Sequence, residues 1–274
     1  FLSPPFLFFS VKKLDLRTIL DQFARGALSF EDVQKEIALH SIEHVEGGIA
    51  RLDVGREARR GLPEIVYAER KEYPDTVKIA LAAAKRNGRV VISRIRKKEV
   101  SRLAGALRRK GLAVEVGRNS TTMLASVMDG RASQGGKTNG AVGVVAAGTS
   151  DIGIAEEARL VAEVMGCKVI TSYDVGIAGM HRIFPVLKEM LAQKVGAIVV
   201  VAGMEGALAS VVASMVDVPV IGVPTSVGYG FGSNGVAALA SMLQSCTLGL
   251  AVVNIDNGVG AGAFAASIAK RKKE

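Results

Sequence analysis

The segment from residue 194 to residue 223, KVGAIVVVAGMEGALASVVASMVDVPVIGV, contains the repeating unit of the fold. Two almost continuous apolar runs, 197–202 and 218–223, are separated by a Gly-rich turn and a segment of helical length. Strands without polar alternation are typical of a parallel sheet that is covered on both faces. A strand, a helix and a second strand in this order form the basic unit of an α/β fold. The segment therefore predicts two neighbouring parallel strands joined by a covering helix.

The same alternation continues along most of the chain. Further apolar runs of strand length lie at 90–95, 112–116, 142–147, 168–172 and 250–255, and amphipathic segments of helical length include 154–165 and 180–193. Residues 11–46 instead carry helically spaced apolar residues: Leu14, Ile19, Leu20, Phe23, Val33, Ile37 and Ile42. We predict an α/β fold, a three-layer αβα domain with a mainly parallel sheet over 75–274, preceded by a small helical region over 1–74.

Composition indicates a soluble, intracellular chain. The 274 residues are 49% hydrophobic and 5% aromatic, which provides ample core for one large or two small domains. Cys167 and Cys246 are too few for a disulfide framework, so we expect a reducing, cytoplasmic environment. The opening FLSPPFLFFSVKK is interrupted by Pro4 and Pro5, and we expect it to be neither a membrane span nor a signal peptide.

The net charge of +9 comes from one segment. Residues 85–118 hold 12 Lys or Arg residues against 2 acidic ones, whereas the rest of the chain is close to neutral. A solvated helix face is the simplest interpretation; an anion site for phosphates or a nucleic-acid surface are the alternatives. Aromatic residues are absent between these charges, so stacking of single-stranded nucleic acid is not expected.

Glycine clusters where the strands of the second half end. Of 31 glycines, 19 fall at residue 140 or later, and the clusters read AAGTSD, VAGMEGAL, GVPTSVGYGFGSNG and NIDNGVGAG. Ligands of open parallel sheets bind outside the carboxyl ends of the strands. Glycine lets backbone approach a ligand, and the helix that follows offers free N–H groups to anions. We therefore expect these four loops to converge on one site.

Several side chains in these loops could carry chemistry. Cys246 could be an inert apolar filler or a nucleophile, because a thiolate is reactive once nearby positive charge lowers its pKa. Glu205, between glycines at a helix start, could favour the helix dipole or act as a general acid or base. Asp151 and Asp256 could each cap a helix. Cys167 is expected in the core.

The histidines give weaker evidence for a functional site than these loop residues. His40 and His44 are spaced to bind a metal on one helix face, but no third ligand accompanies them, so surface positions are expected. His181 follows a strand end. No Ser-His-Asp order, Walker loop or dinucleotide fingerprint is present, and GVGAG opens no early βαβ unit.

Taken together, five motifs resemble the LarB family of nickel-pincer cofactor biosynthesis proteins, relatives of the PurE-type aminoimidazole ribonucleotide carboxylases and mutases. The motifs are LDVGREARRGLPEIVY, AAGTSDIGIAEEA, DVGIAGMHRIF, VAGMEGALASVVASMVDVPVIGVPTSVGYG and MLQSCTLGLAVVNIDNGVGAG, in order over residues 45–265. The resemblance implies a PurE-like, flavodoxin-like catalytic domain. It also implies pyridinium-3,5-biscarboxylic acid mononucleotide synthase activity, in which nicotinic acid adenine dinucleotide is carboxylated on its ring and its phosphoanhydride is hydrolysed to release AMP.

Physical chemistry explains why such a reaction needs a thiol. A pyridinium ring is electron-poor and cannot attack carbon dioxide. Addition of the Cys246 thiolate beside the target carbon makes the ring an enamine-like nucleophile, and loss of the ring proton and the thiolate then restores aromaticity. The resemblance assigns the removal of that proton to Glu205.

The resemblance also supplies the remaining site residues. The expected substrate-binding set is Thr149, Ser150, Asp151, Asp174, His181, Arg182, Gly203, Gly206, Thr225, Ser226, Asn254, Asp256 and Asn257, and the N-terminal motif contributes Asp53, Arg56, Arg59 and Glu64. Carbon dioxide or bicarbonate is the co-substrate, no cofactor is tightly bound, and Mg²⁺ is a candidate metal because divalent ions neutralise phosphate oxygens. The implied assembly is a homo-oligomer, with an octamer as one candidate, without membrane or nucleic-acid partners.

Three stretches bear on this assignment. Gly153 stands where relatives usually have proline, YAERKEYPD replaces a Gly-containing segment, and GRASQGGKTNG reads as a flexible loop over the site. Two alternatives stay open: a PurE-type purine-pathway enzyme, which uses histidine instead of cysteine, and a non-catalytic nucleotide or RNA binder that uses residues 85–118.

Overall fold

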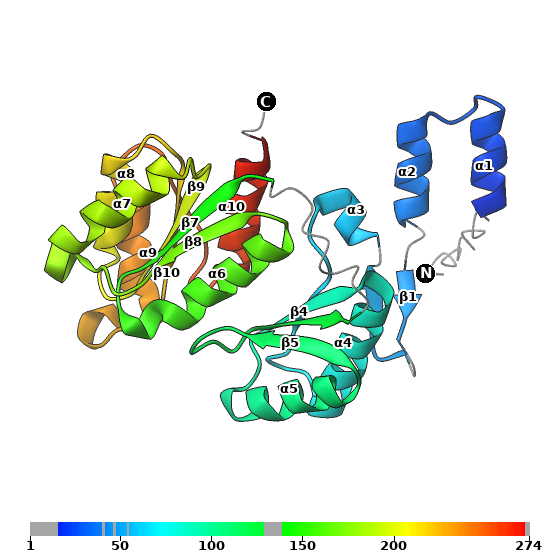
Figure 1. The fold of residues 1–274 in the computed structure, drawn as a ribbon, viewed down its shortest axis with the longest axis horizontal. Coiled ribbons are helices and arrows are strands. Elements are labelled where there is room, and N and C mark those ends of the chain that lie inside the picture. Colours follow the sequence, from blue (N-terminus) through cyan, green and yellow to red (C-terminus); the bar gives the residue numbers. More distant parts are fainter. Residues whose placement is uncertain (1–15, 40–41, 46–47, 54, 129–138, 272–274) are drawn as a thin grey trace, which may run out of the picture.

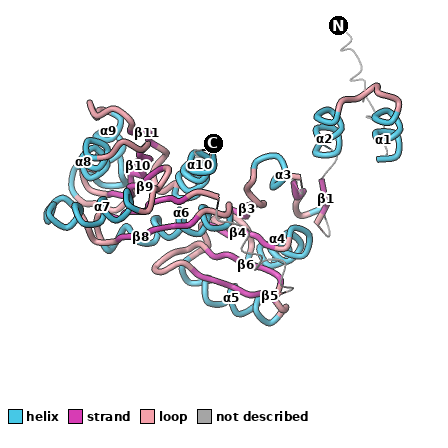
Figure 2. Tube along the Cα trace, turned by 45° about the horizontal axis from the view of Figure 1, so that its top comes forward, coloured by secondary structure: helices cyan, strands magenta, loops and turns pink. Residues whose placement is uncertain are grey.

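The structure, a computed structural model, describes residues 16–39, 42–45, 48–53, 55–128 and 139–271. Within these ranges the chain forms two α/β units, with a pair of helices beyond the first unit (Figure 1). Each unit has its own sheet and its own covering helices (Figure 2). The predicted loop GRASQGGKTNG lies almost wholly outside the described residues.

The C-terminal unit contains a five-stranded sheet in which every pairing is parallel, in the order β11-β10-β9-β7-β8. Its strands are β7 (Ala141–Ala146), β8 (Lys168–Ser172), β9 (Ala197–Ala202), β10 (Val220–Pro224) and β11 (Leu250–Val252). The central strands are buried along their whole length, as the apolar runs predict.

Helices cover both faces of this sheet. They are α6 (Ile152–Val164), α7 (Ile183–Ala192), α8 (Ala207–Met215), α9 (Val236–Leu243) and α10 (Gly258–Arg271). Alternate residues of β9 point to opposite faces: Val199 and Val201 pack with α6 and α10, whereas Ile198 and Val200 pack with α7 and α8. The predicted three-layer αβα fold is confirmed.

The two helices on one face cross at very short range. A Cβ atom on Gly262 of α10 would lie 2.4 Å from the carbonyl oxygen of Ala158 in α6. Glycine is therefore required at this position for packing, because no side chain fits between the two backbones.

The N-terminal unit has a separate, mixed sheet in the order β3-β4-β6-β5. Its strands are β3 (Ile65–Tyr67), β4 (Arg89–Ser93), β5 (Leu112–Val116) and β6 (Met123–Val127), covered by α4 (Tyr73–Asn87) and α5 (Val100–Arg109). Only β3 and β4 are parallel; β6 is antiparallel to both of its neighbours.

This arrangement differs from the sequence-based expectation in two ways. The predicted strands 90–95 and 112–116 belong to this second sheet and not to the parallel one, because each pairs with β6, a strand that the apolar pattern did not reveal. The expected boundary at residue 75 falls inside α4, since the first α/β unit starts at β3.

The elements before β3 are short. Helices α1 (Leu16–Ala24) and α2 (Phe30–Leu39) match the helical spacing, but Ile42 begins β1 (Ile42–His44), which pairs with β2 (Arg51–Asp53) and precedes α3 (Arg56–Arg60). Ser29 caps α2 through its hydroxyl oxygen, which accepts a hydrogen bond from the Asp32 N–H at 3.1 Å. Across the described residues, no helix combines the length and apolarity that a bilayer crossing needs.

One buried side chain ties the two units together. The carboxyl group of Glu157 in α6, 3% exposed, accepts hydrogen bonds from Ser93 Oγ at 2.9 Å and Thr122 Oγ1 at 2.7 Å, both in the N-terminal unit. It also accepts the Val259 N–H, in the first turn of α10, at 2.9 Å. Because one carboxyl group accepts hydrogen bonds from three separate segments, it fixes how the two units pack against each other.

Candidate functional site

A cavity of about 290 Å³ lies at the carboxyl ends of the parallel strands. We call it the loop cavity. Three of the four predicted Gly-rich loops line it, together with the segment after β8; the lining residues are Ala147, Gly148, Ser150, Asp151, Gly176, Ile177, Ala178, Ala202, Gly203, Met204, Glu205, Ala207, Leu208 and Val227. The loops after parallel strands meet at this edge because all the strands run in the same direction.

Asp151 forms the inner wall of the loop cavity and is 4% exposed. Its carboxyl oxygens accept hydrogen bonds from Thr225 Oγ1 at 2.7 Å and from the Gly148 N–H at 2.9 Å. Burial raises the pKa of Asp151, the hydrogen bonds oppose this rise, and the negative charge of Asp256 adds to it. Since its oxygens are already engaged, Asp151 fixes the loops around the cavity.

Glu205 is the exposed acid of the loop cavity. It lies between Met204, with φ of 53°, and Gly206, with φ of 68°, so two left-handed residues turn the chain before α8 begins at Ala207. Among the described residues its carboxylate has no hydrogen-bond or ion-pair partner. Backbone in this conformation is uncommon outside glycine and is concentrated at functional sites. Glu205 is therefore outside the helix and free to contact a ligand.

Gly206 is required at its position for a second reason. A Cβ atom there would lie 2.9 Å from the carbonyl oxygen of Ala238 in α9. Gly203 is equally enclosed, since a Cβ atom would lie 2.3 Å from the Val227 carbonyl oxygen. These contacts hold the Glu205 turn against the neighbouring loop.

The fourth predicted loop, after β11, does not line the loop cavity but contacts one of the loops that do. Asp256 Oδ1 accepts the Ser226 N–H at 2.8 Å, and Ser226 follows Thr225, the partner of Asp151. Asn257 Oδ1 accepts the Gly260 N–H at 2.9 Å and so caps α10, while Asn254 Oδ1 accepts the N–H of the next residue. Asp256 and Ser226 are thus bonded to each other next to the loops of the cavity without lining it, and the two asparagines have local structural contacts.

Other predicted residues lie outside the loop cavity. Thr149 is in the turn that precedes α6 but does not line the cavity. Asp174, with φ of 61°, forms an ion pair with Arg182 at 3.2 Å, and His181 is exposed in the same turn region before α7. The segment between β8 and α7 therefore reaches the cavity through Gly176, Ile177 and Ala178 and not through these polar side chains.

Cys246 does not reach the loop cavity of its own chain. It is exposed and lies between α9 and β11, and β11 enters the sheet at Leu250, beside Val220 at the start of β10. The loop-cavity residues follow the opposite, carboxyl ends of the strands. Cys167, in contrast, is buried as expected, and burial raises the pKa of its thiol.

The N-terminal motif forms an ion-pair cluster in the first unit. Arg56 Nε lies 3.7 Å from carboxylate oxygens of both Asp53 and Glu64. Burial raises the pKa of Glu64, and the charge of Arg56 opposes that rise. Arg59 lies in α3, but its side chain is outside the described part of the structure.

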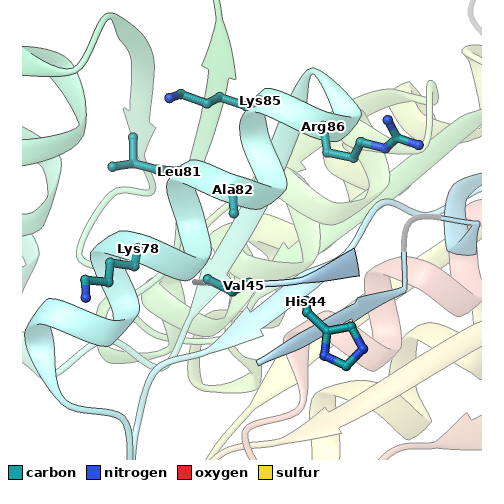
Figure 3. A pocket seen from close by; sticks show the side chains of 7 residues that line it. All are labelled: His44, Val45, Lys78, Leu81, Ala82, Lys85 and Arg86. Atoms are coloured by element: carbon teal, nitrogen blue, oxygen red, sulfur yellow. The ribbon is translucent and has the colours of Figure 1, made fainter. Parts of the chain in front are cut away.

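A larger cavity, of about 490 Å³, lies between α4 and the end of β1 (Figure 3). His44 and three cations of α4, Lys78, Lys85 and Arg86, surround an apolar floor that includes Leu81. His40 is outside the described residues, and among those described no three His, Cys, Asp or Glu residues are grouped for a metal. The described residues thus provide no ready-made metal site.

Comparison with known families matches both units. The model of a LarB/PurE-like N-terminal domain matches residues 43–123, and the model of the AIR carboxylase family matches residues 141–274. The chain belongs to the LarB/PurE superfamily. The first matched range covers the mixed-sheet unit up to the start of β6, and the second covers the parallel-sheet unit from the start of β7.

A curated relative extends the likeness over nearly the whole chain. The uncharacterized protein MJ0165 of Methanocaldococcus jannaschii is 44% identical over 259 residues, which cover 93% of this chain and 97% of that protein. The LarB/PurE assignment indicates a carboxylase-type enzyme.

Proposed function

We propose that this LarB/PurE-type protein carboxylates the pyridinium ring of nicotinic acid adenine dinucleotide and hydrolyses its phosphoanhydride. The products are pyridinium-3,5-biscarboxylic acid mononucleotide and AMP, for nickel-pincer cofactor biosynthesis. The observation that carries the proposal is the exposed Glu205 carboxylate in the lining of the loop cavity, which has no partner among the described residues. A base without competing partners is what removal of a ring proton requires.

Each step of the proposed reaction conserves atoms and electrons. A cysteine thiolate forms a C–S bond to the ring, and the resulting enamine carbon forms a C–C bond to carbon dioxide. Glu205 takes the proton from that carbon, and the electron pair expels the thiolate as the ring becomes aromatic again. Water then cleaves the phosphoanhydride between the two phosphates. Mg²⁺ would serve this last step by neutralising phosphate oxygens.

Because Cys246 lies away from the loop cavity of its own chain, we propose that it acts in the cavity of a second copy. Large apolar side chains are exposed before and after Cys246 in the sequence: Tyr229 at 79%, Phe231 at 102%, Val236 at 62%, Leu243 at 65% and Leu248 at 91%. A set of exposed apolar residues of this size is typical of a surface that another protein covers. A homo-oligomer accounts for both observations.

The first test is a direct assay. The protein is incubated with nicotinic acid adenine dinucleotide, bicarbonate and Mg²⁺, and ring carboxylation and AMP are followed by mass spectrometry. We expect both products from the wild type and no carboxylation from Cys246→Ser or Glu205→Gln. The control Glu189→Gln, an exposed acid of α7, should retain activity. Full carboxylation by Cys246→Ser would remove the thiol from the mechanism.

The second test separates one chain from two. Co-expression of Cys246→Ser and Glu205→Gln chains with different affinity tags yields mixed oligomers. If each site takes its thiol and its base from different copies, random mixing restores about a quarter of the sites. Complete inactivity of purified mixed oligomers would place both groups in one chain.

One alternative is supported by the AIR carboxylase match to residues 141–274, which suits a PurE-type enzyme that acts on aminoimidazole ribonucleotide. That chemistry uses a histidine, and His181 is exposed outside the loop-cavity lining. Turnover of aminoimidazole ribonucleotide, lost in His181→Asn, would favour this alternative over the pyridinium substrate.

A further inference from the structure

The cavity between α4 and the end of β1, which we call the α4 cavity, has a lining of one charge sign. Its volume is about 490 Å³, and its lining residues are His44, Val45, Lys78, Leu81, Ala82, Lys85 and Arg86. Three of these residues are cations and none is an acid. Lys85 and Arg86 begin the basic segment 85–118, and an anion site is one interpretation of that segment. Pockets for small ligands usually measure roughly 300–1,000 Å³, so the α4 cavity has room for one.

The floor of the α4 cavity is apolar and is fixed by the core of the N-terminal unit. Val45, which follows β1, is 5% exposed and belongs to the hydrophobic cluster of this unit. Leu81 and Ala82 of α4 are partly buried against the same cluster. The Val45 N–H donates a hydrogen bond of 2.9 Å to the Ala50 carbonyl oxygen, which closes the β1–β2 hairpin. The floor is therefore in place before any ligand binds.

The spacing of the two lysines indicates the shape of a ligand. Lys78, Leu81 and Lys85 are three and four residues apart on α4, and their side chains extend to the same side of the helix (Figure 3). Seven residues of α-helix rise about 10 Å, which is the distance along the helix axis from Lys78 to Lys85. Leu81 lies between them. A ligand with an anionic group at each lysine therefore has its middle over an apolar side chain.

The charges of both lysines are available to a ligand. Both side chains are exposed, and among the described residues neither has a hydrogen-bond or ion-pair partner. Lys85 is in the last turn of α4, where the helix dipole favours a cation, but Lys78 is in the second turn, where the dipole gives no such support. Cations that line one cavity without an acid repel one another, and a bound anion removes this repulsion.

We propose that the α4 cavity binds a small organic dianion, an elongated molecule with an anionic group at each end and an apolar or aromatic middle. Lys78 binds one end, and Lys85 and Arg86 bind the other. The middle packs on Leu81 and Ala82. The α4 cavity and the loop cavity have no lining residue in common, so this site is separate from the proposed catalytic site and does not depend on the proposed function.

Binding in the α4 cavity should stabilise the β1–β2 hairpin. The ligand contacts α4 on one side and His44, at the end of β1, on the other. β1 pairs with β2, and β2 ends at Asp53 of the N-terminal motif. A molecule that binds the folded chain and not the unfolded one raises Tm. The site thus links an anionic small molecule to the stability of the hairpin that precedes the motif.

The first test compares two probes on the full chain by titration calorimetry. Biphenyl dicarboxylate, with its carboxylates at the two para ends, is a rigid dianion with an aromatic middle, and biphenyl monocarboxylate has the same middle and one charge. The dicarboxylate should bind about tenfold more tightly, because a hydrogen bond to a charged group contributes roughly that factor, and it should raise Tm. Equal affinities of the two probes, or no binding of the dicarboxylate, would overturn the proposal.

The second test uses variants to locate the bound probe. Lys78→Gln and Lys85→Gln each remove one charge at an exposed helix position, and both should fold because glutamine is a good helix former. Each should weaken binding of the dicarboxylate by about tenfold. The matched control Lys98→Gln changes an exposed cation outside the cavity and should bind like the wild type. Wild-type affinity in both Lys78→Gln and Lys85→Gln would mean that the probe binds elsewhere, and the proposal would be wrong.

An acidic segment of another protein is the competing occupant, and a short polyglutamate peptide is its probe. The volume of the α4 cavity favours a small molecule, so the peptide should bind more weakly than the dicarboxylate. Tighter binding of the peptide, lost in Lys78→Gln, would overturn the assignment to a small molecule.

Discussion

Replacing Glu157 by alanine should uncouple the two α/β units. The substitution removes the acceptor of three hydrogen bonds, from Ser93, Thr122 and Val259. Each is worth about 1 kcal/mol net, and the Val259 N–H is left buried without a partner, which adds roughly 1–2 kcal/mol. We therefore expect a loss of about 4 kcal/mol in the free energy of unfolding. For a chain of this size that corresponds to a fall of roughly 8–16 °C in Tm.

The assay is thermal unfolding followed by calorimetry, alongside hydrogen exchange. Uncoupling should also split one transition into two, and amides at the start of α10 should exchange faster than those in β9. Glu157→Gln keeps one acceptor oxygen and should cost less than half as much. The control Glu189→Ala removes an exposed acid of α7 and should stay within about 0.5 kcal/mol of the wild type. A loss below about 1 kcal/mol in Glu157→Ala would refute the view that this carboxyl group holds the units together.

Three further outcomes follow from particular contacts. Burial opposes ionisation of Glu156, but its hydrogen bonds, led by the one from Arg159, outweigh burial and lower its pKa. The ionised Glu156 therefore stabilises the fold above the ordinary glutamate pKa, and this stabilisation is lost as the pH falls through the lowered pKa. Tm should drop on acidification below about pH 4.5, and the drop should be smaller in Glu156→Gln. In Gly262→Ala the new methyl overlaps the backbone of α6 at 2.4 Å, so we expect a loss of roughly 1–3 kcal/mol despite better helix propensity, and a raised Tm would contradict this packing. A maleimide should label Cys246 at least tenfold faster than Cys167, because only Cys246 is exposed; in the native protein, equal rates would contradict the burial of Cys167.

The parallel sheet could be predicted because its strands are buried on both faces. The run that contains Val199 and Val200 has no polar alternation, and this pattern rarely has another explanation once helices flank it. The convergence of the Gly-rich loops followed from strand direction alone. The second sheet could not be predicted in the same way, because β5 alternates between buried and exposed residues and β6 carries polar Ser126 on a short strand.

The position of Cys246 shows why closeness in sequence misleads near a strand. Cys246 and Asp256 are ten residues apart, but β11 lies between them. Extended chain advances about 3.3 Å per residue, so the three residues of β11 alone separate the two by roughly 10 Å. Residues before and after the same strand therefore lie at opposite ends of the strands. The contact between Arg94 and Asp256 could not be predicted, because the two residues are far apart in the sequence and follow strands of different sheets. Only the packing of the two units lets Arg94 Nη2 donate a hydrogen bond to the Asp256 carbonyl oxygen.

Thr225 and Ser226, at the end of β10, hold two other loops in place. Their hydrogen bonds to Asp151 and Asp256 fix the loops after β7 and β11 against the loop after β10. Thr225 is fully buried and does not line the loop cavity, so a substitution there would displace Asp151 and change the cavity without touching a bound ligand.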